Sequence, residues 1–159
     1  MTKRRPRRGA VAVEAALLMP VFISLVLFVM DMGLQAVTQV TMNSAVIAAA
    51  RQMQMGAIRI SSSQVVNLIC SKMSDLADCS GSSLDPRGPF SVYVNSGSSF
   101  SALSPSAVSG RGLVYTTFTP GTNSSFVLLE VAYYSPWYVP LPGMNNKVLV
   151  STIAFQNEP

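Results

Sequence analysis

The chain has 159 residues, 49% of them hydrophobic and only 11% charged, with a formal net charge of +4 and no histidine. This length is enough for one membrane helix and one small domain. The basic excess does not predict a nucleic-acid-binding surface, because it is confined to Lys3, Arg4, Arg5, Arg7 and Arg8, and basic and acidic residues balance from Asp31 onward.

The first element is a basic leader, residues 1–9, followed by an apolar run of 21 residues from Ala10 to Met30. A helix of that length spans roughly 30 Å, the thickness of a bilayer's hydrocarbon core. We therefore predict a transmembrane helix over residues 10–30. Basic residues that flank a membrane segment stay in the cytoplasm, so the N-terminus is expected inside and the rest of the chain outside. A cleaved secretory signal is the alternative, but its apolar core is usually shorter and ends at a small-residue cleavage site.

Glu14 is the only charged residue in the apolar run. It follows Ala10 by four residues, so the two residues lie on one face of a helix. A cut after Gly9 would create an amino group on Ala10 that could pair with its own Glu14 or with that of a neighbouring chain. The alternative is that Glu14 sits among lipid headgroups, favoured by the helix dipole.

The helical pattern resumes beyond Gly33, and we predict nearly one helix from Ala10 to about Arg59, in which residues 31–60 project outward. Pro20 removes one backbone hydrogen bond within it and is expected to bend it. Ser61 and Gln64 have the spacing of a capping box, and the apolar residues that follow predict a short amphipathic helix over Ser62–Leu76.

Two cysteines, Cys70 and Cys79, lie in the predicted exported part. An even cysteine count outside the cytoplasm favours a disulfide, and two unpaired buried thiols are the alternative. The spacing and the absence of histidine argue against zinc.

Four segments rich in Val, Tyr, Phe and Thr predict a mostly antiparallel sheet: Phe90–Val94, Leu113–Phe118, Phe126–Tyr134 and Val148–Phe155. The third is apolar on both faces, so we place it at the centre. The Ser- and Gly-rich segment 95–112 is expected to be a mobile loop. One sheet face should pack on the outward half of the long helix, which makes residues 61–159 an α+β domain.

The chain carries no enzyme constellation, metal-ligand cluster or glycine-rich phosphate loop. We expect a protein that is not an enzyme, with no cofactor, no metal, no nucleic-acid partner and no small-molecule substrate.

Several motifs closely resemble the TadE-like family, the minor pseudopilins of Tad (Flp) pilus systems. They are Arg7 to Glu14, Leu18 with Pro20, Asp31 to Gly33, and Ala49 to Arg51. Further matches lie at Val131 with Tyr133, at Pro136, Pro140 and Pro142, and at Asn157 to Pro159. One departure is Ala15, because an aromatic residue commonly follows the glutamate in Flp-type pilins.

The resemblance implies a structural pseudopilin in which Gly9 is the last leader residue, Ala10 the mature N-terminus and Glu14 the assembly residue. It implies an inner-membrane location with a periplasmic domain, and as partners a prepilin peptidase, other minor pseudopilins and the pilus assembly machinery.

Two other readings remain open. One is an unprocessed, membrane-anchored accessory protein of the same machine. The other is an anchored adhesion or ligand-binding module that uses the aromatic residues Tyr133, Tyr134, Trp137 and Tyr138.

Overall fold

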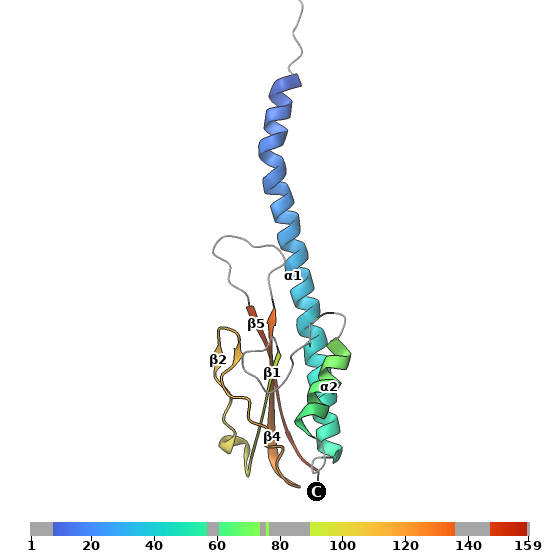
Figure 1. Ribbon diagram of the computed structural model, residues 1–159, viewed down its shortest axis with the longest axis vertical. Coiled ribbons are helices and arrows are strands. Elements are labelled where there is room, and N and C mark those ends of the chain that lie inside the picture. Colours follow the sequence, from blue (N-terminus) through green and yellow to red (C-terminus); the bar gives the residue numbers. More distant parts are fainter. Residues whose placement is uncertain (1–7, 57–60, 74–75, 77–89, 136–146, 159) are drawn as a thin grey trace, which may run out of the picture.

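The structure, a computed structural model, describes residues 8–56, 61–73, 76, 90–135 and 147–158 (Figure 1). A long helix, α1, runs into a small domain made of a second helix, α2, and an antiparallel sheet (Figure 1). The predicted α+β arrangement is confirmed.

Helix α1 spans Arg8–Gly56 and continues through Pro20. Its 49 residues correspond to a length of roughly 73 Å at 1.5 Å per residue. Its first half stands clear of the domain and its second half lies along it (Figure 1). The prediction of nearly one helix from Ala10 is confirmed as far as Gly56, and residues 57–60, where it was expected to end, lie outside the described residues.

Helix α2 spans Ser62–Met73 and begins at the predicted capping box. The Ser61 N–H donates to Gln64 Oε1 at 2.9 Å, and the Gln64 N–H donates to Ser61 Oγ at 3.4 Å. The helix was expected to reach Leu76. The described helix ends at Met73, residues 74 and 75 lie outside the described residues, and the Leu76 N–H donates to the Met73 carbonyl at 2.9 Å.

The main sheet has the strand order β1-β4-β5, with β1 at Phe90–Gly97, β4 at Phe126–Ser135 and β5 at Lys147–Gln156. Both pairings are antiparallel and in uninterrupted register. The prediction that the Phe126 strand is central is therefore confirmed. It is buried on both sides along most of its length, which explains its run of apolar residues.

The predicted strand Leu113–Phe118 is wrong over most of its length. Only Gly112–Leu113 forms a strand, β3, which pairs with β2, Val108–Ser109, in a small hairpin, and Phe118 forms an isolated parallel bridge with Val94. Beyond β3 the backbone N–H of Tyr115 donates to the Ser106 hydroxyl oxygen at 3.1 Å, so a side chain takes the place of a ladder partner.

The segment expected to be a loop, 95–112, contains the end of β1, the 3₁₀ helix η1 at Phe100–Ala102, and β2. It is fixed to the sheet, since the Tyr93 hydroxyl donates to the Ser104 carbonyl at 3.0 Å. The Leu113 N–H likewise donates to Ser91 Oγ at 3.1 Å.

The main core lies between one face of the sheet, α2 and the second half of α1, as predicted for the helix and sheet. It includes Met42, Val46 and Met53 from α1, Ile69 from α2 and Leu129 from β4. A smaller cluster covers the opposite face of the sheet, around Tyr93, Leu113, Leu128 and Ala132.

Candidate functional site

The predicted processing residues lie at the start of α1. Arg8, Gly9 and Ala10 form its first turn, and the exposed Glu14 follows one turn later on the same helix. This helical spacing agrees with the prediction that Ala10 and Glu14 share a face. The remaining basic residues of the predicted leader lie outside the described residues: Lys3, Arg4, Arg5 and Arg7.

The first half of α1 exposes an apolar surface. No residue from Val11 to Met30 is buried, and the mean hydropathy of the most apolar window reaches 2.4. By length and composition this helix can cross a membrane. An exposed apolar surface of this extent needs lipid or protein around it, so the helix is suited to a single-pass anchor.

The second half of α1 has two different faces. One face enters the core through residues such as Met42, Val46 and Met53, all at most 1% exposed. The other carries Val40, which is 68% exposed, and Ile47, which is 44% exposed. The apolar exposed surface therefore continues from the membrane-length segment onto the domain.

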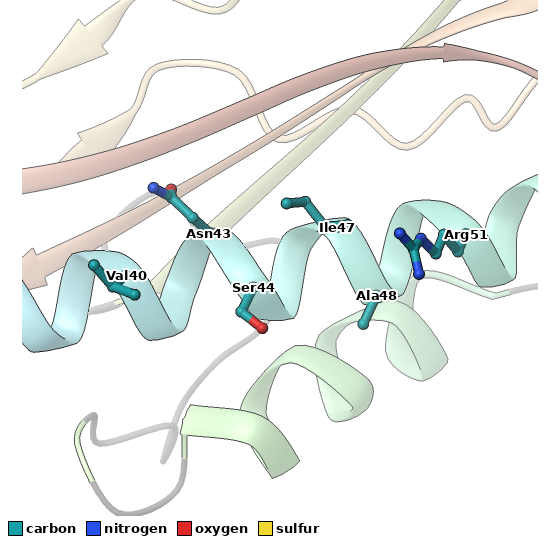
Figure 2. A pocket seen from close by; sticks show the side chains of 6 residues that line it. All are labelled: Val40, Asn43, Ser44, Ile47, Ala48 and Arg51. Carbon is teal, nitrogen blue, oxygen red and sulfur yellow. The ribbon is translucent and has the colours of Figure 1, made fainter.

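A hollow of about 590 Å³ lies on this exposed face. Figure 2 shows the six residues that line it, all on α1: Val40, Asn43, Ser44, Ile47, Ala48 and Arg51. Asn43 and Ile47 point toward the sheet in this view, and Ser44 and Ala48 point toward α2 (Figure 2). Arg51 is the only charged side chain among the six.

Three polar side chains of α1 are buried where it meets the domain, and the sequence analysis named only one of them, Asp31, as part of a family motif. Asp31 is 2% exposed, and Gln35 and Thr38 are each 6% exposed. Gln35 Nε2 donates to Asp31 Oδ2 at 3.3 Å, and the Thr38 hydroxyl donates to the Leu34 carbonyl at 2.9 Å. Their spacing of four and then three residues places them on one helix face, which is a signal that sequence reasoning could have used.

A second missed residue is Glu130, a carboxylate 5% exposed at the middle of β4. Its Oε2 accepts the Ser106 N–H at 2.6 Å, and its Oε1 accepts the Thr152 hydroxyl at 3.5 Å. Burial, and then the charge of Glu130, raise the pKa of the neighbouring Tyr93 hydroxyl above its ordinary value. Glu130 thus connects the outer segment to the sheet.

The remaining predicted residues lie in the domain. Cys70, on α2, is disulfide-bonded, and its predicted partner Cys79 lies outside the described residues. Of the aromatic residues named for the alternative binding module, Tyr133 is 5% exposed and packs in the main core, and Tyr134 is half-buried. Trp137 and Tyr138 lie outside the described residues.

Within the described parts of the chain, no group of three or more His, Cys, Asp or Glu side chains is placed to hold a metal ion.

Residues 9–51 match the family model described as TadE-like protein. The resemblance is therefore confirmed over that segment, which contains Gly9, Ala10, Glu14 and the six described residues that line the hollow. No curated protein and no solved structure shows significant similarity to the chain. The match ends within α1, so it associates the helix with a family of pilus components, one not known for enzymatic activity, and does not reach the sheet.

Proposed function

We propose that the chain is a minor pseudopilin, a structural component of a Tad-type pilus. Helix α1 holds it in the bacterial inner membrane, with the domain in the periplasm, until a prepilin peptidase cuts after Gly9. The observation that carries the proposal is the position of Glu14. It lies exposed on an apolar helix, one turn after Ala10, within the segment that matches the TadE-like family.

A carboxylate in a bilayer costs about 2.5 kcal/mol or more when it is deep, so such groups usually have a partner. Cleavage after Gly9 supplies one, the new amino group of Ala10. Pairing within one chain satisfies both charges. Pairing between neighbouring chains requires an axial offset between two stacked helices, and Glu14 then fixes the register of the assembly as subunits leave the membrane.

The first half of α1 supports assembly with other helical subunits, because its exposed apolar surface from Val11 to Met30 needs lipid or protein around it. In this proposal the partners are other minor pseudopilins and the pilus assembly machinery.

The mass of the mature N-terminus tests the processing step. The protein is isolated from its native host with and without the prepilin peptidase. A chain that begins at Ala10 only when the peptidase is present supports the proposal. Retention of residues 1–9 in both strains would assign the chain to the alternative, a permanently anchored accessory protein.

Glu14→Gln tests the assembly step separately. We expect normal membrane insertion and cleavage but loss of pilus formation, because the neutral side chain no longer pairs with the Ala10 amine. Glu158→Gln, the same change at an exposed position near the end of the chain, is the matched control. Unchanged piliation in Glu14→Gln would refute the role of this carboxylate.

A further inference from the structure

The two edges of the main sheet differ in how the chain covers them. At the β1 edge, the Val94 N–H donates to the Thr117 carbonyl and the Val94 carbonyl accepts the Thr119 N–H, both at 2.9 Å. This edge is therefore closed at Val94 by the chain's own segment 117–119. The other edge is β5.

The hydrogen-bond pattern of an antiparallel ladder alternates along each strand, so it shows which β5 backbone groups point away from β4. Because Val94 bonds outward, its pair with Leu129 is a non-hydrogen-bonded pair. Leu129 then exchanges hydrogen bonds with its other partner, Ile153. The backbone groups of Thr152 and Ala154, the residues on either side of Ile153, must point to the free edge.

This edge is accessible. Thr152 and Ala154 are both exposed, and among the described residues none hydrogen-bonds to their outward backbone groups. Natural sheets usually protect an edge with proline, a bulge or charged side chains. Strand β5 has no proline and no bulge, and its only charged residue is Lys147, at its first position.

The open edge runs beside the hollow on α1. Gln39 Nε2 donates to the Val150 carbonyl at 3.1 Å and to Asn43 Oδ1 at 3.1 Å, so this side of the helix faces β5. Helix and strand both run toward the distal end of the molecule (Figure 1). Two strand residues advance roughly 6.6 Å, which corresponds to about four helical residues. Counting from the Gln39–Val150 bond, Asn43 therefore lies at the level of Thr152, and Ile47 at the level of Ala154.

We propose that the edge of β5 from Thr152 to Gln156, together with this hollow, binds an extended segment of a different protein by strand addition. The added strand would pair its backbone with Thr152 and Ala154. Every second side chain would enter the hollow beside Ile47, where small apolar side chains fit. An acidic group at the distal end of the segment would meet Arg51.

The outward backbone groups of β5 favour a strand over a helix as the bound segment. A helix packed in the hollow would leave the outward N–H and carbonyl groups of Thr152 and Ala154 unpaired in an interface, which costs free energy for each group. A strand satisfies them. This surface lies on the domain and does not depend on whether Gly9 is cut.

Hydrogen exchange tests the proposal on the full-length protein. The exchange of the peptide Val150–Gln156 is compared between membranes of the native host and the protein purified alone in detergent. We expect at least about tenfold slower exchange in the membranes, because the outward amides become hydrogen-bonded. Equal exchange in the two samples would overturn the proposal.

A proline at Ala154 gives the sharper test. Proline is tolerated on an edge strand where the N–H faces solvent, so Ala154→Pro removes the docking donor and keeps the ladder. Ala154→Ser keeps the N–H and is the matched control. We expect the slower exchange in membranes to disappear with proline and to persist with serine, while exchange of the β4 peptide Val127–Val131 stays unchanged in both.

Two further results of the exchange experiment would also overturn the proposal. Slower exchange that survives Ala154→Pro would overturn strand addition. Slower exchange that appears in the purified protein as its concentration rises would assign the edge to a second copy and overturn the proposed partner. The N-terminal mass of the same samples reports cleavage after Gly9, so failure of this inference is distinguishable from failure of the proposed function.

Discussion

Gln39 on α1 and Val150 on β5 are joined directly, because the Gln39 side-chain Nε2 donates to the Val150 carbonyl oxygen at 3.1 Å. This bond joins the second half of α1 to the sheet, and it satisfies an outward carbonyl at the edge of β5. The same amide nitrogen lies 3.1 Å from Asn43 Oδ1 one turn further along the helix. The bond therefore fixes both the rotation of α1 about its axis and the position of the edge strand beside it.

Gln39→Leu is expected to lower the free energy of unfolding of the domain by about 1 kcal/mol, the usual contribution of one hydrogen bond. Chemical denaturation of the full-length protein in detergent measures the change. Gln52→Leu, at an exposed position on the same helix, is the control and should leave stability almost unchanged. Equal effects of the two substitutions would show that the bond to Val150 contributes nothing specific.

Glu130→Ala is expected to destabilise the domain by about 1–3 kcal/mol, because the Ser106 N–H loses its carboxylate acceptor inside the protein. Hydrogen exchange at Ser106 should become faster than in the wild type. Glu130→Gln keeps an acceptor oxygen and should retain most of the protection. If Ser106 exchanges at the same rate in the wild type and in Glu130→Ala, the carboxylate does not hold the outer segment.

The raised pKa of Tyr93 should make the free energy of unfolding depend on pH in the alkaline range. Burial and then the charge of Glu130 raise its pKa in the folded state above 10.0, so the folded domain favours the neutral phenol. Above pH of about 10 the unfolded chain releases a proton that the folded chain retains, and the free energy of unfolding therefore falls as pH rises. Denaturation between pH 8 and about 11 should show a smaller decline in Tyr93→Phe. Tyr115→Phe, at an exposed tyrosine, should decline as the wild type does.

The sequence predicted the elements whose signals are local. The capping box at Ser61 and Gln64 forms the two expected bonds, since both partners lie within one turn. The long apolar run gives α1, and the strand from Phe126 is central because residues on both of its faces are apolar.

What the sequence did not predict depends on residues far apart in the chain. The strand expected from Leu113 to Phe118 is short, because the Ser106 hydroxyl bonds the backbone of Tyr115 where a strand would have done so. The burial of the Glu130 carboxylate was not predicted, because it depends on the Ser106 N–H, which lies 24 residues earlier in the chain. The open edge of β5 follows from strand order, which no single segment encodes.

Asn157 holds the turn that precedes β4. It is 2% exposed, and its side-chain Nδ2 donates to the carbonyls of Pro120 at 3.0 Å and Thr122 at 3.1 Å. Its backbone N–H donates to the Ser125 carbonyl at 2.9 Å. The turn needs this support because it contains Gly121 at φ 79° and Ser124 at φ 62°, both in the left-handed region.

Asn157→Ala is expected to lower the free energy of unfolding by about 1–3 kcal/mol, because two carbonyls lose their shared donor. Asn157→Asp keeps the size of the side chain but supplies no donor, so it should be at least as destabilising. Gln156→Ala removes a single exposed bond, from its Nε2 to the Ser124 carbonyl at 3.2 Å, and should cost less. Denaturation of the three variants in detergent ranks them. A smaller effect at Asn157 than at Gln156 would mean that the turn keeps its shape without the amide.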